Sequence, residues 1–274
     1  MRYFFVSDIH GELDKLIEAL NAAEFNENSD TLVVLGDSFD RGEDSLGVLK
    51  FIMGCKNRIV VAGNHDLRLE DLLYGSWISD CDYSNGVLQT MKSFCENDKL
   101  TSIDVGLTIL KTDDRFKNTY TLLRQYLWES VYAIEWSDLI ATHAWIPVSY
   151  TKQTKMDSTG TYITINNYFY DLEWRKASTE EWENATWSHT GKLFAQRVFP
   201  PKKMIVGHWH SWRLRRMAES QDTNPSADFN FNTFEFEDKL VAIDGCSNAP
   251  QGKVNVWIFE TDEEPTYYTG GQKW

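Results

Sequence analysis

The sequence predicts an α/β fold around a parallel sheet, because short buried strands alternate with amphipathic helices. Residues 2–7 (RYFFVS), 31–36 (TLVVLG) and 58–62 (RIVVA) are apolar runs typical of buried strands. Apolar residues at helical spacing fill the intervals, at 12–24 and 44–54. Two strand–helix units followed by a third strand need crossover connections, which produce parallel strands.

The remaining segments extend this pattern. Residues 66–128 are predicted to be mainly helical, and residues 138–142 and 203–207 are predicted to form two further buried strands. Residues 234–243 and 253–260 are expected to form a terminal antiparallel pair, because a turn rich in Gly, Asn and Pro joins them.

Residues 146–200 break the strand–helix rhythm. They are polar and rich in Trp and Tyr, strand-like at 161–165 and helical at 178–197. We interpret them as an insertion or cap within a single domain that spans residues 1–274. Tryptophans in and near this segment either stack against a nucleobase or peptide aromatic or pack the insertion onto the core, and packing is the preferred interpretation. They are Trp145, Trp174, Trp182, Trp187, Trp209 and Trp212.

Composition limits the partners and the compartment. A chain of 274 residues can bury a large core without disulfides. The net charge of −14 opposes broad binding to a nucleic-acid backbone. The four cysteines form no CxxC pair, which suggests reduced thiols and a cytoplasmic protein. No apolar run is long enough for a signal peptide or a membrane span, so no membrane association is expected.

Polar side chains suited to metals follow five of the predicted strands, namely Asp8, Asp37, Asn64, His143 and His208. In an α/β sheet, functional groups gather at the carboxyl ends of the strands. Carboxylate, imidazole and amide groups together suit borderline divalent metals such as Mn, Fe, Co, Ni and Zn. The sequence therefore predicts a metal centre at this edge.

The histidines support the same interpretation. Five of the six lie at or just beyond predicted strand ends: His10, His65, His143, His208 and His210. A single loop histidine is most often an ordinary surface residue, but five such placements beside Asp and Asn are not explained in that way. Only His189, inside a predicted helical stretch, keeps the ordinary interpretation.

Five motifs in this order resemble the calcineurin-like metallophosphoesterases: Asp8-Ile9-His10-Gly11, Gly36-Asp37-Ser38-Phe39-Asp40-Arg41-Gly42, Gly63-Asn64-His65-Asp66, Thr142-His143-Ala144 and Gly207-His208-Trp209-His210. The resemblance implies a four-layer α/β/β/α sandwich. The Asp-Arg-Gly ending of the second motif is similar to the bacterial and phage serine/threonine protein phosphatase branch. The segment Ile243-Asp244-Gly245-Cys246 is also similar to a segment found in bacterial protein phosphatases and in diadenosine-tetraphosphate hydrolases. Asp66, where the phosphatase branch usually has Glu, and the second histidine His210 depart from that branch. Asp66 is either a carboxylate at a helix N-terminus or a partner of His65, and the sequence leaves both roles open.

The resemblance also implies roles. One of two divalent metals, Mn in the first instance with Fe, Zn, Ni or Co as alternatives, would be held by Asp8, His10 and His210. The other would be held by Asn64, His143 and His208, and Asp37 would bridge the two. Arg41 would hold a phosphoryl oxygen, His65 would protonate the leaving group, and Asp40 would orient His65.

The implied activity is metal-dependent phosphoester hydrolysis. Two cations about 3.5–4 Å apart lower the pKa of a shared water, giving a metal-bridging hydroxide near neutral pH. The leading hypothesis is a phosphomonoesterase of the protein Ser/Thr phosphatase type, acting on a phosphorylated protein. The alternatives are a dinucleoside-polyphosphate hydrolase or a cyclic-nucleotide phosphodiesterase, both acting on a small nucleotide. A non-catalytic scaffold is disfavoured because no ligand is missing.

Overall fold

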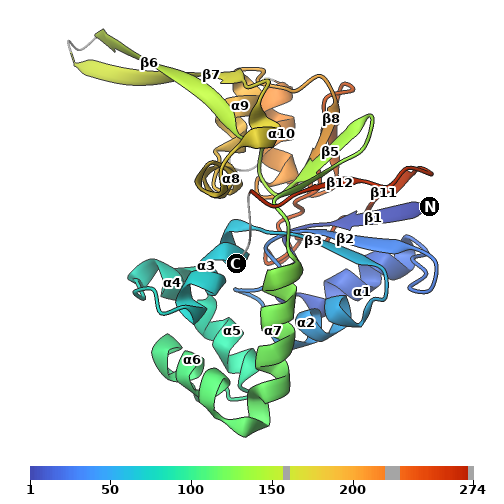
Figure 1. Cartoon of the computed structure of the whole chain (residues 1–274), viewed down its shortest axis with the longest axis vertical. Coiled ribbons are helices and arrows are strands. Elements are labelled where there is room, and N and C mark those ends of the chain that lie inside the picture. Colours follow the sequence, from blue (N-terminus) through green and yellow to red (C-terminus); the bar gives the residue numbers. More distant parts are fainter. Residues whose placement is uncertain (157–160, 220–228, 271–274) are drawn as a thin grey trace.

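Two β-sheets lie face to face in the computed structural model, and helices cover the outer side of each (Figure 1). The structure describes residues 1–156, 161–219 and 229–270. The first sheet has the order β11-β1-β2-β3. Its parallel strands are β1 (Arg2–Val6), β2 (Thr31–Leu35) and β3 (Arg58–Val61), and β11 (Trp257–Glu260) runs antiparallel beside β1. The parallel arrangement predicted for the first three strands is confirmed.

Helices cover the outer face of this sheet. They are α1 (Leu13–Ala22), α2 (Ser45–Gly54), α3 (Asn64–Leu73), α4 (Asp80–Asn85), α5 (Val87–Phe94), α6 (Ile103–Thr112), the 3₁₀ turn η1 (Asp114–Phe116) and α7 (Lys117–Glu129). Alternate strand residues such as Phe4 and Val34 point into the core that these helices close. The prediction of a mainly helical stretch over 66–128 is confirmed.

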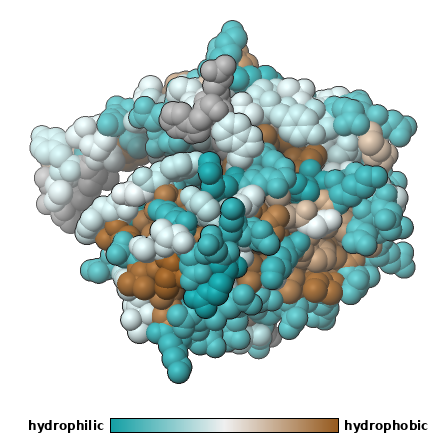
Figure 2. All heavy atoms as spheres, turned by 60° about the horizontal axis from the view of Figure 1, so that its bottom comes forward, coloured by the Kyte–Doolittle hydropathy of each residue, from teal (hydrophilic) through white to brown (hydrophobic). Residues whose placement is uncertain are grey.

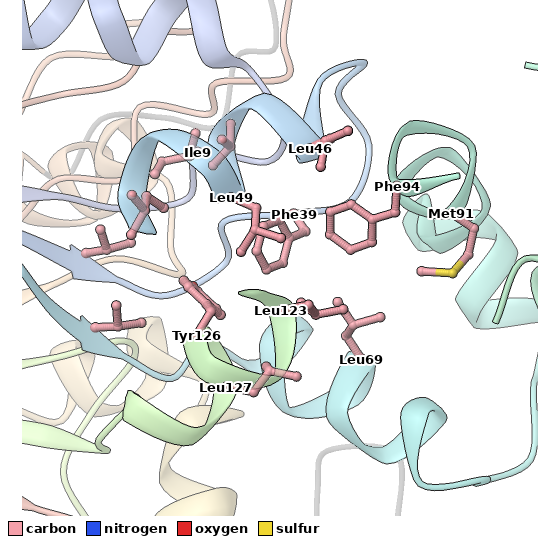
Figure 3. Close-up of a cluster of buried hydrophobic side chains, with 14 of the residues drawn as sticks. Ile9, Phe39, Leu46, Leu49, Leu69, Met91, Phe94, Leu123, Tyr126 and Leu127 are labelled. Carbon is pink, nitrogen blue, oxygen red and sulfur yellow. The ribbon is translucent and has the colours of Figure 1, made fainter. Parts of the chain in front are cut away.

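Two motif residues anchor the site loops in this core. Ile9, from the first motif, and Phe39, from the second, are buried and point into it (Figure 3). The ring of Phe39 makes edge contacts with Phe94 on α5 and Tyr126 on α7, at centroid distances of 5.4 Å and 5.0 Å. Burial of these side chains fixes the loops on which the neighbouring polar residues stand.

The second sheet has the order β12-β4-β5-β8-β10-β9. Its strands are β4 (Ala133–Glu135), β5 (Leu139–Thr142), β8 (Lys203–Val206), β9 (Phe234–Phe236), β10 (Leu240–Ala242) and β12 (Thr266–Tyr268). The central strands β5, β8 and β10 are parallel. The layer between the two sheets is apolar and contains Phe5, Val33, Ile134, Ile205 and Val241. The α/β/β/α sandwich is therefore confirmed.

The expected terminal antiparallel pair is wrong. Residues 234–243 contain β9 and β10, which pair with each other in the second sheet, whereas β11 pairs with β1 in the first. Both Val241 and Trp257 face the layer between the sheets. The apolar pattern of each segment is thus satisfied in either arrangement, so pattern alone could not choose the pairing partner.

Residues 146–200 form a hairpin and short helices. Strands β6 (Val148–Met156) and β7 (Tyr162–Tyr170) pair only with each other among the described strands, and their hairpin projects from the molecule (Figure 1). The segment continues with η2 (Trp174–Lys176), α8 (Thr179–Thr186) and α9 (Thr190–Ala195). Trp174 and Trp182 are buried in the core on the outer face of the second sheet, together with α10 (Ser211–Ala218). The role of residues 146–200 as a cap stays a prediction.

The surface at the helical end of the molecule carries many hydrophilic residues with apolar patches between them (Figure 2). Within the described residues, no helix combines the length and apolar character that crossing a membrane requires.

Candidate metal centre

The predicted site residues stand where strands of both sheets end. Asp8 and His10 follow β1, Asp37 follows β2, and Asn64 and His65 begin α3 directly after β3. From the second sheet, His143 follows β5, whereas His208 and His210 follow β8. Asp8, His10, Asp37 and His208 have φ values of 50°, 48°, 53° and 64°. This left-handed backbone is uncommon outside glycine and turns the chain sharply at each strand end.

Asp37 lies at the junction of two groups of metal-ligand atoms. Within each group the atoms are within 4.8 Å of one another, and the groups are His10–Asp37–His65 and Asp37–His143–His208. Oδ1 of Asp37 lies 3.5 Å from Nε2 of His143, and Oδ2 lies 3.9 Å from Nε2 of both His10 and His65. The two carboxylate oxygens thus face different sets of imidazoles, as a bridging ligand requires.

Backbone carbonyls fix the tautomers of two of these imidazoles. Nδ1 of His10 donates to the Phe39 carbonyl at 2.8 Å, and Nδ1 of His143 donates to the Leu35 carbonyl at 2.7 Å. A ring that donates through Nδ1 keeps a lone pair on Nε2 for a metal. Oδ1 of Asn64 lies 3.0 Å from Nε2 of His143, and the role of Asn64 as a metal ligand stays a prediction.

Asp8 and His210 lie outside the two compact groups of ligand atoms and contact other residues. Oδ2 of Asp8 accepts from the Ser7 hydroxyl and from the backbone N–H of His208, the latter at 2.9 Å. Nδ1 of His210 lies 2.9 Å from Oδ2 of Asp244. Among the described residues, the two compact groups contain His65 and contain neither Asp8 nor His210. The assignment of Asp8 and His210 as ligands therefore stays a prediction.

Burial and neighbouring charges set the protonation of the centre. Burial, followed by the charge of Arg41, lowers the pKa of His10 to about 3, and burial lowers that of His208 to about 4. Burial alone would raise the pKa of Asp37, but the surrounding histidines, led by His143, bring it well below its usual range. Burial also lowers the pKa of His143, but the charges of Asp37 and Asp8 outweigh it and raise that pKa. Metals bind the ionised carboxylate and neutral imidazoles, so metal binding would release the proton of a charged histidine.

His65 belongs to a carboxylate–imidazole pair. Its Nδ1 lies 2.7 Å from Oδ2 of Asp40, and the hydroxyl of Thr90 donates to Oδ1 of Asp40 at 2.7 Å. Burial lowers the pKa of His65, but Asp37 and Asp40 outweigh it and raise that pKa to about 9. Asp40 therefore contacts the ring of His65, and its role in orienting that ring stays a prediction. Thr90, which holds Asp40, carries no sequence motif and was not predicted.

Arg41 faces the same centre. Its Nη1 lies 2.8 Å from Nε2 of His10, and its Nη2 lies 3.1 Å from Nε2 of His65. Its backbone has a φ of 68°, and Gly86 packs so closely that a Cβ there would lie 2.3 Å from the Arg41 nitrogen. The loop is therefore held where the guanidinium fork reaches the histidines.

Asp66 serves the backbone and not the ring of His65. Its Oδ2 accepts from the N–H groups of Gly63 and Asp37, both at 2.9 Å. The bond from the Gly63 N–H caps the start of α3. The bond from the Asp37 N–H holds the backbone of Asp37, the residue shared by the two ligand groups. Of the two roles that the sequence allowed, the helix-terminal carboxylate is the one observed.

The donor set fits two divalent metals. Buried carboxylates with oriented imidazoles and an amide match the ligand preferences of borderline ions. Four buried carboxylates, from Asp8, Asp37, Asp66 and Asp244, add negative charge that such cations would neutralise.

This chain belongs to the calcineurin-like phosphoesterase family, whose model matches residues 1–212. The predicted family is confirmed, and with it the class of phosphoester hydrolases.

Individual relatives are similar over shorter stretches. A symmetrical bis(5'-nucleosyl)-tetraphosphatase of Buchnera aphidicola subsp. Acyrthosiphon pisum is 41% identical over 70 residues, covering 25% of this chain and 26% of the relative. The Aeromonas hydrophila protein of the same name is 50% identical over 66 residues, or 24% of each chain. The chain thus spans about a quarter of the length of these relatives. A solved structure described as a proposed diadenosine tetraphosphatase has a TM-score of 0.50 at 18% identity, covers 98% of this chain and 95% of its own, and supports the fold.

Proposed function

We propose that this chain is a dinuclear-metal phosphomonoesterase of the protein Ser/Thr phosphatase type. The observation that carries the proposal is the position of Asp37, between two imidazole groups and next to the His65–Asp40 pair. Asp8, His10 and His210 would hold one metal, Asn64, His143 and His208 would hold the other, and Asp37 would be shared by both. When bound, the two metals would polarise the phosphoryl group and lower the pKa of a water.

His65 and Arg41 handle the substrate in this proposal. Arg41 carries a planar fork that can bind two phosphoryl oxygens. In the structure this fork lies against Nε2 of His65. A substrate phosphate that draws the fork away frees Nε2 to carry a proton, and Asp40 favours the protonated ring. His65 then delivers that proton to the departing alkoxide.

Hydrolysis of dinucleoside polyphosphates is the second candidate. It is favoured by the names of the sequence relatives and by the surface next to His210. The ring of Trp212 is nearly parallel to that of His210, with centroids 6.3 Å apart, and the Arg213 guanidinium lies 5.2 Å from the Trp212 ring. An indole beside arginines can stack on a nucleobase near a polyphosphate.

A hydrolysis panel with added Mn²⁺ separates the candidates. It compares p-nitrophenyl phosphate, its bis-ester, a phosphopeptide and diadenosine tetraphosphate, with Asp37→Asn as the inactive control. Highest kcat/KM on the phosphopeptide supports the protein phosphatase type, and highest kcat/KM on diadenosine tetraphosphate supports the second candidate. Activity of Asp37→Asn that equals the wild-type activity and does not depend on added metal would contradict both candidates.

The four cysteines are unpaired, which supports action in the cytoplasm.

A further inference from the structure

One face of α5 lies against the loop that carries the second motif. Three residues at the spacing of a helical turn, the first of them directly before the helix, meet three consecutive residues of that loop. The pairs are Gly86 with Arg41, Thr90 with Asp40, and Phe94 with Phe39 (Figure 3 shows the last pair). Helix α5 contributes no residue to the five motifs, yet it supports the loop on which Asp40 and Arg41 stand.

The hydroxyl of Thr90 makes a reciprocal pair of hydrogen bonds with Asp40. It donates to Oδ1 of Asp40 at 2.7 Å and accepts from the Asp40 N–H at 2.8 Å. Oγ of Ser45 lies 3.4 Å away and can donate to the remaining lone pair of the Thr90 hydroxyl. Thr90 is 0% exposed, so the hydrogen-bonding capacity of its hydroxyl is used within the protein and solvent does not reach it.

The pair of bonds restrains both the backbone and the carboxylate of Asp40. The backbone has a φ of 71°, which a residue other than glycine keeps only when its surroundings hold it there. The two carboxylate oxygens have different partners, because Oδ1 accepts from Thr90 and Oδ2 lies 2.7 Å from Nδ1 of His65. A carboxylate bonded through one oxygen alone could turn about its Cβ–Cγ bond. The bond to Oδ1 therefore limits the directions in which Asp40 can present Oδ2 to the imidazole.

We propose that Thr90 is a positioning residue for the protonation of the leaving group, because it holds Asp40 in the place from which the carboxylate directs Nε2 of His65 towards the departing oxygen. The inference rests on the proposed function, in which His65 delivers that proton. Thr90 acts through Asp40 and not on the substrate. A misdirected proton donor matters most where the leaving group needs the proton. The role requires a hydroxyl, so serine can replace Thr90 and valine cannot.

The dependence of turnover on the leaving group tests the assignment. The kcat on phenyl phosphate, which has a poor leaving group, is divided by the kcat on p-nitrophenyl phosphate, which has a good leaving group and a similar shape. Thr90→Val should lower this ratio by about 10–100-fold, the cost expected when a partner that orients a functional side chain is removed. Thr90→Ser should keep the ratio. Thr119→Val, the same change at a buried threonine on α7, should also keep it.

Thr90→Ala provides a second test, because it removes the hydroxyl without placing a methyl group against the Asp40 N–H. It should lower the ratio as Thr90→Val does. Loss of stability or of metal would instead lower kcat on both substrates by the same factor. An equal fall on both substrates in Thr90→Ala, or an unchanged ratio, overturns the proposal.

The variant His65→Asn separates the role of Thr90 from the proposed function on which it rests. His65→Asn should itself lower the ratio, and adding Thr90→Val to it should cause no further loss, because both changes act on one proton transfer. An unchanged ratio in His65→Asn contradicts the proposed role of His65 and, with it, that of Thr90. A lowered ratio in His65→Asn beside an unchanged ratio in Thr90→Val contradicts the role of Thr90 alone, and so does a double variant in which the two losses multiply.

Discussion

Asp37 is a buried carboxylate that lies close to other buried carboxylates. It is 2% exposed and shares the centre with the buried carboxylates of Asp8, Asp66 and Asp244. Burial, followed by the charges of Asp244 and Asp37, raises the pKa of Asp8 to about 7. Burial, followed by the charge of Asp37, raises the pKa of Asp66 to about 7. Carboxylates crowded in this way are stabilised by cations placed among them.

The first prediction contrasts Asp37→Asn with Asp8→Asn. Asp37→Asn should weaken the binding of both metals, because the amide replaces a carboxylate whose two oxygens face both groups of histidines. Asp8→Asn should weaken one metal only. Metal titration followed by elemental analysis measures the two occupancies. Equal loss in the two variants would contradict the bridging role of Asp37.

The second prediction concerns His65. His65→Asn should keep its metals and lose about 10²–10⁴ in turnover, as expected for a missing general acid. The loss should be smaller on substrates with good leaving groups, which need less protonation. The matched control is His189→Asn, a change of an exposed histidine that caps α9. Loss of metal from His65→Asn would instead make His65 a ligand, consistent with its place in the first compact group.

The sequence was informative about which residues carry the chemistry and less so about their supporting contacts. Strand ends followed by Asp, Asn and His predicted the residues that meet at Asp37. Thr90 could not be found in this way, because its bond to Asp40 depends on how α5 packs against a loop distant in sequence. The choice between two roles for Asp66 likewise depended on backbone geometry that only the folded chain provides.

At the scale of elements, the region of α8 carries one buried tryptophan and one exposed tryptophan. Trp182 is 1% exposed and lies between Tyr132 and Trp174, whereas Trp187, at the end of the helix, is 53% exposed. Trp187 and His189 line a groove of about 670 Å³ below the hairpin. The ring of His189 in turn contacts Trp209, which lies between the two histidines of the GHWH motif, at a centroid distance of 4.4 Å.

The third prediction follows from this difference. Trp182→Ala should destabilise the protein by about 3–5 kcal/mol, the usual cost of removing a buried tryptophan. Trp187→Ala should change stability by less than about 0.5 kcal/mol and should alter the ratio of KM values for large and small substrates. Urea unfolding and paired kinetics measure the two effects. A constant KM ratio in Trp187→Ala would mean that this part of residues 146–200 does not contact substrate.

The fourth prediction concerns the ionic cluster that joins β4 to its neighbours. Glu135 on β4 binds Arg175 of η2, Lys202 and the hydroxyl of Tyr268 on β12. Burial would raise the pKa of Glu135, but these three partners lower it to about 2. A carboxyl with a depressed pKa stabilises the fold above its unfolded value of about 4.3, and the stabilisation is lost as the pH falls towards 2.

Glu135→Gln should therefore cost about 2 kcal/mol at pH 7, since it leaves two cations without their carboxylate. Arg175 is partly exposed, and solvent screening keeps the loss from being larger. The difference in unfolding free energy between wild type and Glu135→Gln, measured in urea, should shrink between pH 4 and pH 2. A gap independent of pH would mean that the charge of Glu135 contributes nothing.

At the scale of the whole molecule, the site is where the two sheets meet. Asp8, Asp37 and Asn64 come from the first sheet, and His143 and His208 come from the second. The sequence predicted the parallel strands because crossover helices leave a periodic signal. It could not predict which sheet receives β11, because the layer between the sheets is apolar on both sides and accepts the same pattern from either.

This arrangement leads to the last prediction, that metals cross-link the two sheets and stabilise the entire fold. A ligand that binds only the native state at about 100 times its Kd adds about 2.7 kcal/mol per site. Two sites together add about 5.4 kcal/mol, and for a chain of this size each kcal/mol raises Tm by about 2–4 °C, so saturating Mn²⁺ should raise Tm by about 10–20 °C over protein treated with a chelator. His189→Asn should show the full increase, and Asp37→Asn should lose most of it, because its carboxylate lies at the junction of the two ligand groups. Calorimetry with and without metal measures the difference. A wild-type Tm that does not respond to metal would mean either that the ions do not bind at this junction or that they bind without joining the sheets, and the metal content of the calorimetry samples distinguishes these two outcomes.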